Sequence, residues 1–192
     1  MTANVSAADR HEVTTILTED HQAMLDLIDV IKQATDATTR RDTADTVIAE
    51  VMRHSVAEEM FVYPAMEKHL PQGKEEVEHD KQEHEGLVDV MKRLEDVDAE
   101  DHGFMELVHE LESQLRHHVS DEEDEQFPKL REYISVDERQ EMGQKVEQAK
   151  RVAPTRPHPN APQSELFHKT IGPGVGMVDR LRDKLTGRDT GQ

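Results

Sequence analysis

A repeated pattern of histidines and glutamates constrains the fold of this chain more than any other feature. Residues 54–64 read H-x-x-x-E-E with an aromatic residue and a proline after it, and residues 118–128 repeat this order. In both copies the proline comes ten residues after the histidine. A second repeat pairs D-H-Q-A-M-L-D-L-I at 20–28 with E-H-E-G-L-V-D-V-M at 83–91. The two offsets, 64 and 63 residues, indicate that one helical pair has been duplicated.

Apolar residues recur at steps of three and four along most of the chain, which is typical of amphipathic helices. We expect helices over residues 9–35, 41–69 and 74–97, and a fourth from about residue 101. Long helices joined by short connections favour antiparallel neighbours. The predicted fold class is therefore all-α, an antiparallel up-down four-helix bundle. Pro64 and Pro128 lie inside the second and fourth patterns, where each is expected to kink or end its helix.

The domain organisation follows from composition. Residues 1–134 are expected to form the four-helix bundle, residues 135–152 an additional fifth helix, and residues 153–163 a proline-rich linker. Residues 164–192 are expected to form a C-terminal helical extension, which is too short to hold a core of its own. The extension either docks on the bundle, mediates oligomer formation or stays mobile, and the sequence does not choose among these.

The chain is strongly acidic, with 42 acidic and 23 basic residues and a formal charge of −19. This field repels phosphates, so nucleic acid and anionic membranes are not expected partners. The absence of cysteine excludes disulfides, thiolate zinc sites and iron–sulfur clusters. No apolar run approaches the ~20 residues of a membrane span, and the N-terminal residues lack a signal-peptide core. The expected location is cytoplasmic.

Every predicted helix carries polar residues on the apolar stripe that must face the bundle axis. Burying such groups without partners is costly, so they require compensation. In each H-x-x-x-E pair the two side chains lie one turn apart on the same helix face. Four neutral imidazoles and two carboxylates carry a charge of about −2, and this mixed set suits iron, manganese or zinc. The alternative is a set of buried His–Glu ion pairs. The candidate metal ligands are His21, His54, Glu58, His84, His118 and Glu122.

The order of these motifs over about residues 10–134 resembles the hemerythrin-like HHE cation-binding domain family. The resemblance implies a four-helix bundle that holds two non-haem Fe ions, joined by an oxo or hydroxo bridge. It also implies that Glu58 and Glu122 bridge the irons and that the four histidines are terminal ligands.

Two positions depart from the oxygen-carrying members that the family includes. Those proteins resemble H-x-x-x-H on the third helix, whereas Asp80 stands four residues before His84 here. Asp80 is a candidate oxygen ligand or hydrogen-bond partner of a ligand, and a merely polar position is the alternative. His117 also matches the oxygen carriers, because it lies five residues before Glu122. His118 is favoured by the repeat spacing and the apolar stripe, and His117 stays a candidate.

Weaker candidates surround this set. Tyr63 and Tyr133 could approach the centre as hydrogen-bond donors or redox-active phenols, although an ordinary packed tyrosine explains each as well. Glu76-x-x-His79 and Glu106-x-x-His109 match the E-x-x-H element of ferritin-like bundles but fall off the apolar stripe.

The residue set also suggests a function. Fewer histidines than in an oxygen carrier make the centre more anionic or less fully ligated, which stabilises ferric iron and admits a small oxidant. We therefore expect an oxidoreductase of peroxidase or catalase type that acts on hydrogen peroxide, nitric oxide or oxygen. A non-catalytic module for oxygen or iron binding, sensing or storage is the alternative, and a metal-free helical interaction protein is a third hypothesis.

Overall fold

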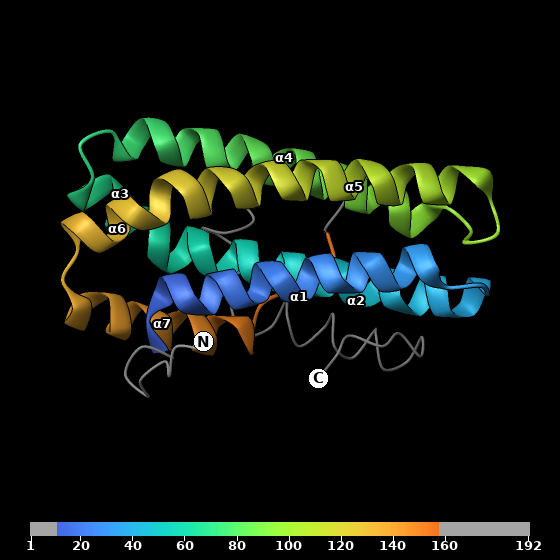
Figure 1. The fold of residues 1–192 in the computed structure, drawn as a ribbon, viewed down its shortest axis with the longest axis horizontal. Coiled ribbons are helices and arrows are strands. Elements are labelled where there is room, and N and C mark those ends of the chain that lie inside the picture. Colours follow the sequence, from blue (N-terminus) through green and yellow to red (C-terminus); the bar gives the residue numbers. More distant parts are fainter. Residues whose placement is uncertain (1–10, 158–192) are drawn as a thin grey trace, which may run out of the picture.

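The computed structural model describes residues 11–157, and within this range the chain is helical with no strand. Two helical hairpins lie side by side, α1 with α2 and α4 with α5, and α7 packs across α1 and α2 (Figure 1). Short turns join the helices, so neighbours run antiparallel and the predicted fold class is confirmed. The elements are α1 Val13–Gln33, α2 Ala37–Ala57, η2 Glu58–Val62, α3 Tyr63–His69, α4 Gly73–Asp96, α5 His102–Asp121, η3 Glu122–Gln126, α6 Phe127–Tyr133 and α7 Val136–Lys150.

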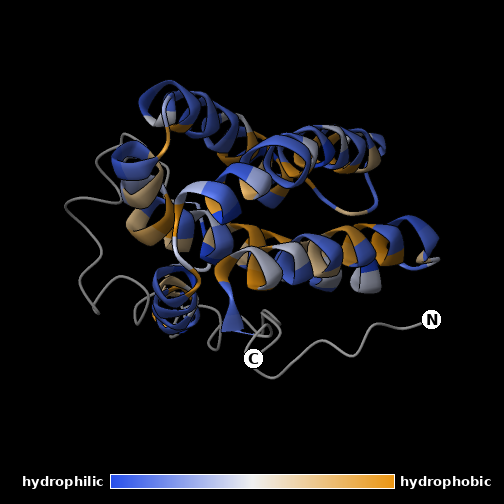
Figure 2. Cartoon of the chain, turned by 60° about the vertical axis from the view of Figure 1, so that its left-hand side comes forward, coloured by the Kyte–Doolittle hydropathy of each residue, from blue (hydrophilic) through white to orange (hydrophobic). Residues whose placement is uncertain are grey.

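The apolar stripes of the helices face one another and the charged faces are turned outward (Figure 2). Two apolar clusters result. One fills the end of the bundle where the α1–α2 and α4–α5 turns lie, and includes Ile28, Ile48 and Phe104. The other fills the opposite end, beneath α3, α6 and α7, and includes Leu17 and Leu130. The polar residues of the sequence repeat lie between these two clusters.

The prolines do not end their helices, contrary to one of the two outcomes expected from the sequence. A wider π-helical turn precedes each proline, and the chain then continues as α3 or α6. The amide of Tyr63 donates to the carbonyl of Glu58, five residues earlier, and Phe127 donates in the same way to Glu122. In an α-helix the proline ring would clash with the carbonyl four residues before it, and the wider turn removes this conflict. Each π turn begins at a candidate ligand, Glu58 or Glu122.

The fifth predicted helix is α7, which packs on α1 and α2. A Cβ atom on Gly143 would lie 2.2 Å from the backbone oxygen of His11, so only glycine allows α7 to approach this closely. Buried Arg139 anchors the same contact, because its Nε donates to Glu12 at 2.7 Å and its Nη1 donates to the carbonyl of Arg131 at 3.1 Å.

Some sequence predictions fall at the edges of the described range. The predicted start of the first helix at residue 9 and the extension at 164–192 lie outside the described residues, as does most of the 153–163 linker. At the start of that linker Arg156 makes an ion pair with Glu95 at 3.5 Å. No helix between residues 11 and 157 combines the length and the apolar character that a membrane crossing requires.

Candidate metal centre

Six polar side chains gather in the middle of the bundle, and all six are at most 3 % exposed. We call this set the buried cluster. Each of the four bundle helices supplies one histidine, and the glutamates come from the first residues of the two π turns. The residues are His21, His54, Glu58, His84, His118 and Glu122.

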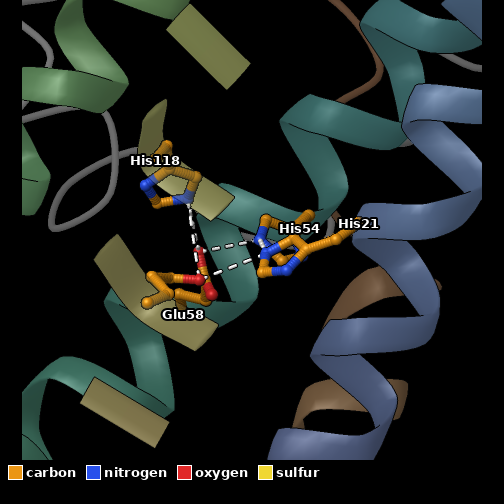
Figure 3. Close-up of side chains that lie close together, drawn as sticks. His21, His54, Glu58 and His118 are labelled. Carbon is orange, nitrogen blue, oxygen red and sulfur yellow. Dashed lines mark hydrogen bonds and ion pairs between the residues drawn. The ribbon is translucent and has the colours of Figure 1, made fainter. Parts of the chain in front are cut away.

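The histidines form two pairs, which we call the first and the second histidine pair. In the first pair, His21 and His54 have ring centroids 4.7 Å apart, and their Nε2 atoms lie 3.1 Å from each other. Nε2 of His54 lies 3.1 Å from Oε2 of Glu58, and Nε2 of His21 lies 3.1 Å from Oε2 of Glu122. Figure 3 shows His21 and His54 turned toward Glu58 from one side and His118 from the other.

The second pair, His84 and His118, has ring centroids 4.9 Å apart. Its Nε2 atoms face the same two glutamates at slightly longer distances. Oε2 of Glu58 lies 3.4 Å from Nε2 of His84 and 4.0 Å from Nε2 of His118, and Glu122 lies 3.8 Å from His118. The two carboxylates therefore stand between the two histidine pairs.

These atoms fit a metal better than they fit one another. Two ligand atoms bonded to one ion at about 2.1 Å and at right angles lie about 3 Å apart, which is the spacing in the first pair. Both oxygens of Glu58, Oε2 of Glu122 and Nε2 of His118 are buried without any hydrogen bond. Buried polar atoms rarely lack a partner. Imidazole nitrogens and carboxylate oxygens that converge without hydrogen bonds are suitable ligands for divalent first-row metals.

A further carboxylate faces the outer nitrogen, Nδ1, of every histidine in the cluster. The first pair contacts one residue from α1 and one from η3, and the second pair contacts one from α4 and one from η2. The contacts are His21 to Glu123 at 2.8 Å, His54 to Asp20 at 3.6 Å, His84 to Glu59 at 3.3 Å and His118 to Glu83 at 3.0 Å. A proton held on Nδ1 by such a partner leaves Nε2 free to bind an ion.

The two glutamates of the buried cluster and the four outer carboxylates together make this region attractive to cations. Burial by itself lowers the pKa of His54, but Glu58 and Asp20 outweigh this effect and raise the pKa to about 10. The same balance of burial against Glu58 and Glu59 raises the pKa of His84 to about 10. The cluster without metal therefore takes up protons, and bound metal ions would replace them.

One aromatic ring packs against each histidine pair, at matching positions before the two prolines. Tyr63 stacks on His84 with centroids 5.7 Å apart, and its hydroxyl lies 3.3 Å from both ring nitrogens. Phe127 stacks on His21 at 5.9 Å. Tyr133, the other tyrosine considered from the sequence, does not take such a position. This residue ends α6 and is 45 % exposed, so Phe127 is the residue that occupies the position matching Tyr63.

Asp80 lies fully buried on α4, one turn before His84. The amide of Gln126 donates to its Oδ1 at 2.7 Å, while Oδ2 has no hydrogen bond. Burial and the nearby charge of Glu122 raise the pKa of Asp80 to about 7, against the effect of the Gln126 hydrogen bond. Asp80 is thus placed beside the buried cluster with one oxygen still available.

The other candidates lie outside the cluster. The side chain of His117 is 65 % exposed on the outer face of α5, whereas that of its neighbour His118 is 1 % exposed. The side chain of His79 is 53 % exposed, and Glu76 accepts from Lys129 at 2.9 Å. His109 is also exposed on α5. Neither E-x-x-H element therefore reaches the bundle axis.

The outer carboxylates were not predicted from the sequence, although their positions repeat. Asp20 and Glu83 each precede a histidine of the cluster, while Glu59 and Glu123 each follow a glutamate of the cluster. The repeated D/E-H and E-E pairs were therefore an available signal. Gln126 had no such signal, because its counterpart 64 residues earlier is Val62.

Comparison with known proteins agrees with this geometry. Residues 12–130 match the hemerythrin HHE cation-binding domain. The chain is 32 % identical over 168 residues to the uncharacterized hemerythrin-like protein C869.06c of Schizosaccharomyces pombe, and the match covers 87 % of this chain and 83 % of that protein. No solved structure matches the chain. The chain thus belongs to the hemerythrin HHE cation-binding family, which implies a metal-binding site, and five residues of the buried cluster, His21, His54, Glu58, His118 and Glu122, form a group that could hold a metal ion.

Proposed function

We propose that the buried cluster holds two iron ions and that the protein turns over a small oxidant, namely hydrogen peroxide, nitric oxide or oxygen. One observation carries the proposal. Two histidine pairs face two shared glutamates, and both oxygens of Glu58 and Oε2 of Glu122 accept no hydrogen bond. Each pair would hold one ion, with Glu58 and Glu122 between them.

The charge around the cluster favours oxidant turnover over reversible oxygen carriage. Four histidines are surrounded by six carboxylates, counting the two glutamates of the cluster and the four outer partners. Each outer carboxylate makes its imidazole a stronger donor toward a metal. A centre so rich in anionic groups stabilises ferric over ferrous iron. Bound iron would supply Lewis-acid and electron-transfer chemistry.

The protein residues provide exclusion and proton handling. Tyr63, Phe127 and the two apolar clusters close the centre against bulk water, which restricts entry to small molecules. Glu123 is hydrogen-bonded to Nδ1 of His21 and has a side chain that is 33 % exposed. This carboxylate connects a buried imidazole proton with the solvent.

The test is to express the full chain, measure iron per chain, and follow the loss of peroxide with and without nitric oxide. Free iron at the same concentration sets the background rate, and an ultraviolet–visible spectrum reports on the metal centre, because a bridged ferric pair absorbs in the near ultraviolet. We expect two irons per chain and peroxide loss well above the free-iron rate. Exposed His109 gives a matched control, since His109→Ala should change neither quantity.

Two outcomes would redirect the proposal. Iron uptake without turnover above free iron would favour the binding, sensing or storage function. Limited proteolysis of apo, ferrous and ferric protein would then separate a sensor, whose cleavage pattern changes with state, from a storage protein. Normal folding with no metal recovered would reject both.

A further inference from the structure

A second group of metal-ligand residues lies on the surface between α4 and α5. Each helix supplies a histidine and a carboxylate one turn apart, and the two pairs face each other. We call His79, Glu83, His117 and Asp121 the surface ring.

The contacts in the surface ring form a closed circuit. Nε2 of His79 lies 3.6 Å from Oε1 of Glu83 and 3.3 Å from Oδ2 of Asp121. Nδ1 of His117 lies 3.4 Å from the same oxygen of Glu83 and 3.3 Å from Oδ1 of Asp121. Each carboxylate thus faces both imidazoles. In an ordinary surface ion pair, each charged group contacts a single partner.

The sequence explains why this ring lies outside the buried cluster. His117 and Asp121 each come one residue before a residue of the cluster, and Glu83 comes one residue before His84. A shift of one residue rotates a side chain by about 100° around the helix, which turns these groups toward the solvent. A histidine and a carboxylate at positions i and i+4 lie on the same helix face, at a spacing that lets both side chains bind one ion.

On the matching face of α1 and α2, a positive charge balances the outer carboxylate. Asp20, the counterpart of Glu83, faces Nδ1 of His54 and makes an ion pair with Lys150 of α7. The lysine ammonium therefore balances the outer carboxylate on that side. Between α4 and α5, Glu83 uses Oε2 to accept from His118 at 3.0 Å and turns Oε1 toward the two exposed histidines. In the described chain, α7 packs on α1, α2 and η2.

We propose that the surface ring is a second metal site, which binds one divalent transition ion such as Zn²⁺. Two imidazoles and two carboxylates form a mixed nitrogen and oxygen set suited to these ions. Ligand atoms of His79, Glu83 and Asp121 all lie within 4.8 Å of one another, so small side-chain rotations bring them onto one ion. This ion would take the place that Lys150 holds on the opposite side. It would share Glu83 with the buried cluster, one oxygen on the ion and the other on His118.

The experiment is a Zn²⁺ titration of the full chain as purified, followed by calorimetry and by metal analysis after gel filtration. The test variant His79→Gln/His117→Gln removes both imidazoles, and the control variant His102→Gln/His109→Gln removes two exposed histidines elsewhere on α5. We expect wild type and control to bind one Zn²⁺ more than the test variant. Asp121→Asn, which changes a side chain that touches only the ring histidines, should weaken that binding by about tenfold or more.

The comparison between variants does not depend on the buried cluster. All variants keep its six residues, so whatever metal it holds cancels in the difference. Equal Zn²⁺ uptake by the test variant and the control would overturn the second site and leave the proposed di-iron function untouched. Loss of Zn²⁺ binding by the control as strongly as by the test variant would also overturn it, because exposed histidines in general would then be responsible.

Discussion

The two histidine pairs arise from one sequence repeat but lie in different surroundings. Around the first pair, the layer toward α3 and α6 is apolar and is formed by Leu17, Val62 and Phe127. Around the second pair, the matching positions are Asp80, Gln126 and Tyr63, which form a buried polar group. The first pair is also covered from outside by α7, whereas the surface ring flanks the second pair. The duplicated pattern therefore preserves the ligands and varies what surrounds them.

This difference separates two roles within one centre. In the proposed di-iron centre, the ligands that would hold the ions are constrained by geometry, so both copies of the repeat keep them. The neighbouring positions would decide which of the two proposed ions can meet a polar molecule. In the layer toward α3 and α6, the second pair has Asp80, whose Oδ2 accepts no hydrogen bond, and a phenol hydroxyl, whereas the matching positions at the first pair are apolar. We infer that the two ions would differ in reactivity.

The largest expected effect is loss of metal when one histidine of either pair is removed. His54→Ala in the first pair and His118→Ala in the second should each lower iron content and melting temperature together. Metal at 1,000 times its dissociation constant stabilises the folded state by about 4 kcal/mol, or about 10 °C for a chain of this size. Metal analysis and calorimetry measure both. If apo and loaded wild-type protein melt at the same temperature, the expectation fails.

Substitutions at two glycines test how closely α7 packs over the first histidine pair. Gly143→Ala places Cβ 2.2 Å from a backbone oxygen of His11, so α7 must move, at a cost of about 1–3 kcal/mol. Gly86→Ala on α4 is the control. Its Cβ would meet only the flexible side chain of Gln114, and alanine favours the helix by up to about 1 kcal/mol. Urea denaturation measures both variants. Equal destabilisation by the two substitutions would contradict the close packing of α7.

The polar residues beneath the second histidine pair can be replaced by the apolar residues that stand at the matching positions of the first pair. The double variant Asp80→Leu/Gln126→Val copies Leu17 and Val62 into the matching positions. Replacing a buried polar pair by apolar residues is neutral or stabilising, so we expect the apo protein to gain about 1–2 kcal/mol. Denaturation of the apo form measures this, and a loss of stability would show that the polar pair is needed for folding.

The same double variant decides the role of Asp80. If iron per chain falls to about half that of wild type, Asp80 is a ligand of the second ion. Unchanged iron content with slower peroxide loss would instead make it a group that meets the oxidant.

The duplicated ligands and the helix periodicity were enough to predict the bundle, its helix order and the six residues that meet at its axis. What the sequence could not supply depends on side-chain direction across helices. Tyr63 stacks on His84 from the other hairpin, and Glu83 reaches His118 from α4, contacts that no local spacing encodes. The π turns were missed for a related reason, because proline is compatible with more than one local backbone and the packed ligands select among them.

The smallest expected effect concerns the one hydroxyl that distinguishes the two aromatic rings. Tyr63→Phe makes the second pair resemble the first, where Phe127 already packs on a histidine without a hydroxyl. The lost contacts to His84 are 3.3 Å long, so the free energy of unfolding should fall by about 0.5–1 kcal/mol. Thermal melting measures the stability, and iron content should not change, because ring stacking keeps His84 in place. The rate of peroxide loss is the informative readout. An unchanged rate would mean that the phenol only packs, whereas a slower rate at constant iron would show that the hydroxyl acts on the oxidant at the second pair.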